Sequence, residues 1–110
     1  MNNVEYCNLK KITPVKIEDF ESVEQITEAL ANKARLAILY ALNKYGELCA
    51  CEIIPSFKLA QPTITLHLQK LYNAGLLKKR EEWKYTYYSI KDEYLQFVRT
   101  VLELNKKSKL

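Results

Sequence analysis

Two cysteines, Cys49 and Cys51, stand two positions apart, and a third, Cys7, lies near the start of the 110-residue chain. On a strand-like backbone or in the first turn of a helix, this spacing lets both sulfurs reach one ion, and Cys7 would add a third. Thiolates are soft ligands that select As(III), Cu(I), Cd(II), Pb(II) or Zn(II) over hard cations. Three sulfurs suit As(III) best, since its lone pair fills the fourth direction, whereas zinc wants a fourth ligand. The chemistry and spacing of Cys49, Cys51 and Cys7 are therefore compatible with a site for a thiophilic metalloid or metal.

Three other interpretations of the cysteines stay open. Free cysteine suits small buried positions, so Cys49 and Cys51 could be packing residues. Reversible oxidation of Cys49, with Cys51 or with Cys7, would make a redox switch, although a Cys-x-Cys disulfide closes a small strained ring. A thiol enzyme with Cys49 as nucleophile is disfavoured, because no base is near and the sequence has no Cys-x-x-Cys. We therefore expect no enzymatic activity.

A second chemical signal is the polar face of residues 59–75. Ile64, Leu68 and Leu71 form an apolar stripe at helical spacing, and Pro62 and Gly75 suit the first turn and the stop of a helix. The other face carries short polar and amide side chains, which bind base edges and phosphates in a major groove. The predicted DNA contacts of this helix are Gln61, Thr63, Thr65, His67, Gln69 and Lys70. His67, the only histidine, is interpreted as a phosphate contact or a packing residue rather than a metal ligand.

Positive charge is concentrated on the same part of the chain. Residues 1–55 carry six Lys or Arg against eight Asp or Glu, whereas residues 56–91 carry seven against two, a balance of +5. Such cations are needed where phosphates are neutralised. The predicted contacts to the flanking DNA backbone are Lys78, Lys79, Arg80 and Lys84. The alternatives are a solvated basic face without a partner and a protein-interaction domain, and the +5 balance counts against the second.

The elements that position these residues follow from their periodicity. Residues 18–30 and 92–104 predict amphipathic helices, and Asn32 and Gly46 mark the start and stop of a more buried helix. Pro55 limits the segment that follows to one or two turns. Strands at 76–81 and 84–90, joined by Glu82-Trp83, form a hairpin. This order predicts a mostly α fold with a small β-hairpin, a winged helix-turn-helix of order α-α-α-α-β-β-α.

The chain divides into a flexible arm (residues 1–17), a winged-helix domain with a dimerisation helix at each end (residues 18–104) and a polar tail (residues 105–110). A domain this short buries only about two-thirds of its unfolded surface, so a homodimer would add burial. The apolar contacts expected between two copies are Phe20, Val23, Ile26, Phe97, Val98 and Val101.

Two observations bear on the compartment. No apolar run approaches a membrane span of about 20 residues, and residues 1–9 lack the apolar core of a signal peptide. The sequence therefore predicts a cytoplasmic protein with no membrane partner. In a reducing compartment the three cysteines would be free thiols or metal ligands rather than disulfides.

Segments 32–39, 46–53, 61–68 and 71–77 resemble the arsenic-repressor (ArsR) family of bacterial and archaeal transcriptional regulators. The resemblance covers roughly residues 29–90. It implies a homodimeric repressor that binds double-stranded operator DNA without a cofactor and is released by a metalloid or metal ion. The helix predicted over residues 59–75 would then be the reading helix, the one that enters the major groove. Two such helices in a homodimer, about 34 Å apart, would require an imperfectly palindromic operator. The alternative is a winged-helix repressor switched by cysteine oxidation, or one with no metal signal.

The family motif Glu-Leu-Cys-x-Cys-x-x-Cys aligns its first two cysteines with Cys49 and Cys51 and its third with Ile54. A related cadmium- and lead-sensing branch completes the site from the N-terminal arm, where Cys7 stands. The resemblance therefore implies As(III) as the favoured inducer, with Cd(II) or Pb(II) next. The family's other metal site, on the last helix, has no counterpart because residues 92–104 lack histidine. Leu66 stands where the family often has Arg or another polar residue, and Trp83 stands where the wing turn usually has Gly.

Overall fold

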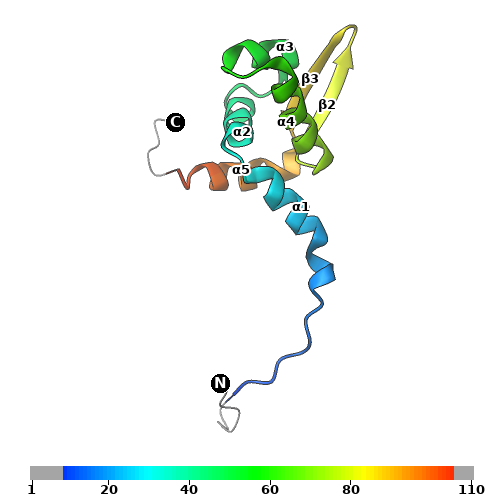
Figure 1. Ribbon diagram of the computed structural model, residues 1–110, viewed down its shortest axis with the longest axis vertical. Helices are drawn as coiled ribbons and strands as arrows, with labels where there is room; N and C mark the ends of the chain where they lie inside the picture. Colours follow the sequence, from blue (N-terminus) through cyan, green and yellow to red (C-terminus); the bar gives the residue numbers. More distant parts are fainter. Residues whose placement is uncertain (1–8, 106–110) are drawn as a thin grey trace.

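The computed structural model describes residues 9–105, which form a helical body with one β-hairpin projecting from it (Figure 1). In chain order the elements are η1 (Ile17–Phe20), α1 (Glu21–Leu30), α2 (Lys33–Tyr45), β1 (Leu48–Cys49), α3 (Ala50–Ile53), η2 (Ile54–Ser56), α4 (Gln61–Asn73), β2 (Leu77–Glu82), β3 (Tyr85–Ile90), η3 (Asp92–Tyr94) and α5 (Leu95–Leu102). Each η element is a 3-10 turn. This order confirms the predicted winged helix-turn-helix.

Both ends of α2 lie where the sequence places them. The Asn32 side chain accepts hydrogen bonds from the backbone N–H groups of Ala34 (2.9 Å) and Arg35 (3.1 Å), which satisfies two donors that a helix start leaves unpaired. At the other end Gly46 takes a φ of +88° and donates to the Leu42 carbonyl. This left-handed conformation favours glycine and ends the helix.

The reading helix α4 has the predicted start, stripe and stop. Pro62 lies in its first turn, where a missing N–H group leaves no hydrogen bond unmade. Gly75 takes a φ of +90° after the helix. The N–H of Gly75 donates to Tyr72 and that of Leu76 to Leu71, at 3.0 and 3.2 Å. This pair of bonds is a Schellman motif, which ends α4 and turns the chain directly into the hairpin.

One apolar core lies between α2, α4, α5 and the base of the hairpin. α4 contributes Ile64, Leu68 and Leu71, each essentially without exposed surface, as the stripe predicts. The other fully buried side chains are Ile38, Leu39, Leu42, Ile53, Leu76, Leu77 and Val98. Burying an aliphatic side chain of this size stabilises the fold by about 1.5–3 kcal/mol. The reading helix is therefore held rigidly against α2 by its inner face.

The hairpin belongs to a three-stranded antiparallel sheet of order β1-β3-β2. β1 was not predicted from the sequence, because a two-residue strand carries no periodicity. β1 pairs with the outer edge of β3, with Leu48 opposite Tyr88 and Cys49 opposite Tyr87. The cysteine segment is therefore an edge strand of the wing sheet as well as the start of α3.

Three predicted boundaries are corrected. The hairpin turn consists of Trp83 and Lys84 rather than Glu82 and Trp83, because Glu82 pairs with Tyr85. Trp83 takes a φ of +58°, the left-handed region in which a turn favours glycine. The first and last helices each begin with a 3-10 turn, at Ile17 and Asp92, and the last α-helix ends at Leu102 rather than Leu104.

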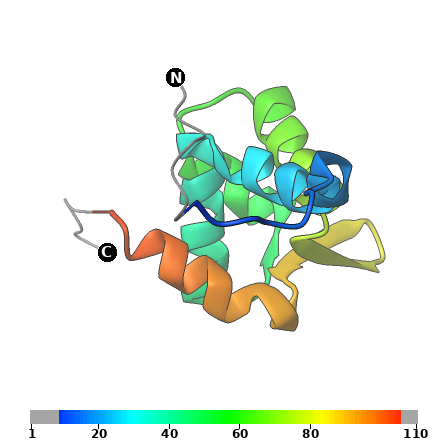
Figure 2. The same ribbon diagram turned by 90° about the horizontal axis from the view of Figure 1, so that it is seen from below.

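Residues 9–16 extend away from the body beyond the start of α1 (Figure 1), and in the view from below they lie in front of it (Figure 2). The predictions for residues 1–8 and 106–110, which include most of the polar tail, lie outside the described residues. Among residues 9–105 we find no helix that combines the length and the apolar character needed to cross a membrane.

Candidate nucleic-acid interface and cysteine site

The exposed face of α4 is the predicted reading surface, but its members differ in exposure. Gln61, Thr65, Gln69 and Lys70 are exposed, whereas Thr63 and His67 are half-buried on the flank of the helix. Leu66 points outward beside Gln69 and is 66% exposed. A large apolar side chain in the middle of a polar face is suited to contact a thymine methyl group. Leu66 was predicted only as a departure from the family pattern, and its exposure adds it to the candidate contacts.

His67 joins the reading helix to the helix pair behind it. Its Nδ1 lies 3.3 Å from Nη1 of Arg35, at the start of α2, and Arg35 also donates through Nε to the Ala29 carbonyl at 2.6 Å. The same guanidinium reaches the Glu28 carbonyl at 3.3 Å. Arg35 therefore covers the C-terminal carbonyls of α1 and touches α4. No local pattern indicates this role of Arg35, since 32 positions separate Arg35 from His67.

The environment of His67 makes the fold sensitive to acid. Burial, and secondarily the nearby charge of Arg35, lower the pKa of His67 below its ordinary value of 6.5. The unfolded chain therefore binds a proton more readily, and His67 destabilises the fold progressively as the pH falls below about 6.5. Above that pH it has no such effect. Urea denaturation at pH 7.5 and 5.5 should show a loss of stability in the wild type that is smaller in His67→Gln. Equal losses in the two proteins would contradict this assignment.

The four predicted cations of the wing are exposed on or beside the hairpin, and each has a partner within the protomer. Lys78 lies 3.8 Å from Asp92, and Lys79 and Lys84 lie over the rings of Tyr72 and Trp83 at 4.4 and 4.9 Å. Single exposed ion pairs contribute little to stability. These three lysines therefore remain available to a phosphate.

Arg80 differs from the three lysines. Its guanidinium donates to both carboxylate oxygens of Glu47, at 2.8 and 3.2 Å, and to Glu82, and it lies 4.5 Å from the ring centroid of Tyr87. The hydrogen bonds that Arg80 donates to the carboxylates of Glu47 and Glu82 raise the pKa of Arg80 above its ordinary value. The same contact lowers the pKa of Glu47. The Arg80 guanidinium is therefore already bound by two carboxylates of its own protomer, although the residue lies at the surface.

The structure brings Cys49 and Cys51 together at the junction of β1 and α3. Their Cα atoms are 5.1 Å apart and the sulfurs form a disulfide. Cys49 is 3% exposed, whereas Cys51 is exposed. The expectation of free thiols or metal ligands rather than a disulfide is therefore wrong for this pair in the structure, because residue 49 on an extended backbone and residue 51 in the first helical turn lie within disulfide range. In the reduced protein the same proximity would offer two thiolates to one ion.

Cys49 also has a structural role, as the N-cap of α3. Its Sγ accepts a hydrogen bond from the Cys51 N–H at 3.2 Å, and Oε1 of Glu52 accepts one from the Cys49 N–H at 2.8 Å. These two bonds form a capping box at a helix of only four residues. A short helix depends on such a cap because it has few bonds of its own.

The third predicted ligand, Cys7, lies outside the described residues. Within residues 9–105 no group of three or more His, Cys, Asp or Glu side chains is arranged to hold a metal ion. The described part of the site is thus limited to the sulfurs of Cys49 and Cys51.

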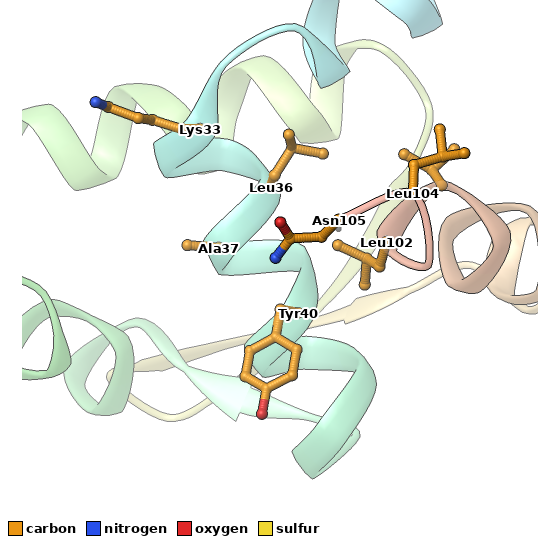
Figure 3. A pocket seen from close by; sticks show the side chains of 8 residues that line it. Lys33, Leu36, Ala37, Tyr40, Leu102, Leu104 and Asn105 are labelled. Atoms are coloured by element: carbon orange, nitrogen blue, oxygen red, sulfur yellow. The ribbon is translucent and has the colours of Figure 1, made fainter. Parts of the chain in front are cut away.

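The predicted dimer contacts divide into two groups. Phe20, Val23 and Phe97 are exposed, and Ile26 and Val101 are partly buried against the core. Val98 is 1% exposed, so its assignment to the interface is wrong: the side chain belongs to the apolar core of the protomer. An apolar groove of about 490 Å³ lies between α2 and the end of α5 (Figure 3). Its lining residues are Lys33, Leu36, Ala37, Tyr40, Val101, Leu102, Leu104 and Asn105.

Comparison with known proteins gives a consistent result. Residues 32–79 match the family model for bacterial regulatory proteins of the arsR family. An uncharacterised HTH-type transcriptional regulator of Methanocaldococcus jannaschii is 38% identical over 80% of this chain and its own whole length. The arsenical resistance operon repressor of Bacillus subtilis is 35% identical over 71% of this chain and 74% of its own.

The fold has solved counterparts. One is the solution NMR structure of the homodimeric winged helix-turn-helix DNA-binding domain of a possible ArsR-family regulator from Mycobacterium bovis. It superposes with a TM-score of 0.72 at 26% identity and covers 93% of this chain and 94% of that one. From the fold and these relatives together, the chain belongs to the ArsR family of DNA-binding winged helix-turn-helix transcriptional regulators.

Proposed function

We propose that the protein is a homodimeric repressor released from its operator when a thiophilic ion, As(III) before Cd(II) or Pb(II), binds reduced Cys49 and Cys51. The observation that carries this proposal is the position of the two sulfurs at the start of α3, between the wing and the reading helix. The relative in Bacillus subtilis is an arsenical resistance operon repressor, which supports the choice of inducer.

The proposed DNA interface consists of α4 and the hairpin. Gln61, Thr65 and Gln69 would bind base edges in the major groove, and Leu66 would contact a thymine methyl. Thr63 and His67, on the half-buried flank, would reach only the adjacent phosphate. The proposed contacts to the sugar-phosphate backbone are Lys70, Lys78, Lys79 and Lys84. These lysines make the affinity salt-dependent.

The proposed dimer uses α1 and α5. The exposed side chains of Phe20, Val23 and Phe97, together with Ile26 and Val101, would pack against a second copy, and the groove between α2 and α5 continues this apolar surface. The Mycobacterium bovis counterpart is homodimeric, which supports this assignment. Two reading helices about one DNA turn apart would read an imperfect palindrome.

Ion binding would act through residues that already have a second task. The Cys49 sulfur caps α3, and α3 with η2 leads into α4. An ion that takes the sulfurs of Cys49 and Cys51 therefore competes with the cap that fixes this turn. Because coupling between two ligands is reciprocal, operator DNA would weaken ion binding by the same factor.

The disulfide supports a second candidate function, a repressor switched by oxidation. Closing the Cys49–Cys51 bond changes the same turn without an ion. Peroxide would then replace arsenite as the signal, and a thiol reductant would reverse it.

The test is fluorescence anisotropy of the reduced protein on a duplex from its own promoter, with and without stoichiometric arsenite. We expect arsenite to weaken binding about 20-fold, a mid-range value for coupled sites. The effect should vanish in Cys49→Ser, whose hydroxyl keeps the cap on α3, and Cys7→Ser tests the third ligand. Tight binding that ignores arsenite but is lost with peroxide would exclude the metalloid and establish the oxidation switch.

A further inference from the structure

The wing sheet connects Cys49 with Arg80 through a single residue. Cys49 is the register partner of Tyr87 on one side of β3, and Arg80 is the partner of Tyr87 on the other. Directly opposed residues on neighbouring strands lie on one face with their Cβ atoms about 5 Å apart. Cys49, Tyr87 and Arg80 therefore form a row across all three strands.

Side-chain contacts join the two ends of this row. Glu47 directly precedes β1, and both of its carboxylate oxygens accept hydrogen bonds from Arg80 on β2, at 2.8 and 3.2 Å. The Arg80 guanidinium lies over the Tyr87 ring. A two-point arginine–carboxylate contact fixes the relative orientation of its partners more firmly than a single bond. Segment 47–51, which contains both cysteines, is thus attached to the hairpin by side chains as well as by the β1–β3 ladder.

The tip of the hairpin provides a reporter. Trp83, the only tryptophan in the chain, is 85% exposed at the turn and makes an edge-on contact with Tyr85. Along the hairpin, two register pairs, Glu82–Tyr85 and Glu81–Thr86, separate Trp83 from the Arg80–Tyr87 pair. A change in the twist or mobility of the hairpin would therefore alter the surroundings of this single fluorophore.

We infer that Glu47 and Arg80 are positioning residues that couple the chemical state of Cys49 to the wing. When the Cys49–Cys51 bond opens or closes, the backbone of segment 47–51 shifts. Glu47 transmits this shift to Arg80, and through Arg80 to the hairpin. The wing is then the element that receives the signal from the cysteines. The regulatory meaning of this coupling rests on the proposed function. The coupling also reassigns Arg80 from a DNA-backbone contact to the internal support of the wing.

The test follows Trp83 emission and its quenching by acrylamide in the full chain without DNA, before and after reduction. A Cys7→Ser background leaves Cys49–Cys51 as the only dithiol. Dithiothreitol gives two electrons and two protons to the disulfide, producing two thiols, and itself closes to a cyclic disulfide. We expect a clear difference in quenching between the oxidised and reduced forms of this background.

Two carboxylate-to-amide variants separate the coupling from a general effect on the sheet. Glu47→Gln removes the ion pair with Arg80 and should reduce the oxidised-to-reduced difference to less than half. Asp92→Asn removes the ion pair with Lys78, which lies on β2 as Arg80 does. This variant should keep the full difference in quenching between the oxidised and reduced forms. Circular dichroism establishes that both variants are folded.

Each outcome has one meaning. The absence of a redox difference in the Cys7→Ser background, or a full difference in Glu47→Gln, overturns the inference. If arsenite still weakens operator binding fully in Glu47→Gln, the signal takes another route and the proposed function stands. If the quenching results are as expected but arsenite has no effect on operator binding, the coupling stands and the metalloid fails as the inducer.

Discussion

Leu68→Ala is expected to destabilise the fold by about 2–5 kcal/mol, the range for removing a large aliphatic side chain from a packed core. Leu68 is 1% exposed and lies at the centre of the α4 stripe. Its loss leaves a cavity under the reading helix, where helix packing is the main source of helical stability. Because total stabilities of small domains are about 5–15 kcal/mol, the variant should have a visible unfolded population and weakened operator binding.

Urea denaturation followed by circular dichroism measures this effect, with all proteins at one protomer concentration because a dimer's stability depends on it. Leu66→Ala is the matched control: it makes the same change in the same helix at a position that is 66% exposed. Its stability should change by no more than about 0.5 kcal/mol. Similar losses of unfolding free energy in the two variants would show that burial of the apolar stripe does not stabilise α4 against the core.

Gln69→Glu is expected to weaken operator binding by about 100-fold without loss of stability. The side chain is exposed on α4, and the change removes an amide donor and introduces a negative charge of almost the same shape. One lost base contact is worth about 1–3 kcal/mol, and in the proposed dimer the change occurs twice. Repulsion from the phosphates adds to this loss.

The matched control for this variant is Gln96→Glu on α5, which changes the net charge by the same amount. α4 and α5 lie on opposite sides of the body (Figure 2), and Gln96 is exposed. Anisotropy titrations on the promoter duplex should show near-wild-type binding for this control. Equal losses would mean that total charge, rather than contact through α4, determines the affinity.

Local sequence signals predicted the helices that position the site. Pro62, the stripe of Ile64, Leu68 and Leu71, and Gly75 specify α4 by rules that act within one turn. Asn32 and Gly46 did the same for α2. These features depend on residues within about four positions of one another, so no tertiary information was needed.

The errors arose where the outcome depends on a distant partner. β1 exists because β3 offers it an edge, and Val98 is buried because α5 packs on α2. Arg80 has the charge expected of a phosphate contact, but its guanidinium is bound by the carboxylate of Glu47, 33 positions away. Trp83 occupies a left-handed turn position, which a rule based on residue preference assigns to glycine. From sequence alone, candidate residues of the proposed interface could be named, but not which of their side chains already bind a partner within the protein.

The N-cap made by Cys49 has an evolutionary consequence. Serine caps a helix as well as a sulfur does or better, and a cysteine codon becomes a serine codon by a single base change. Such a substitution would remove the thiol chemistry while α3, the wing sheet and the reading helix keep their support. Under the proposed mechanism, response to a signal and binding of the operator can therefore be gained or lost separately, and a single mutation would convert an inducible repressor into a constitutive one.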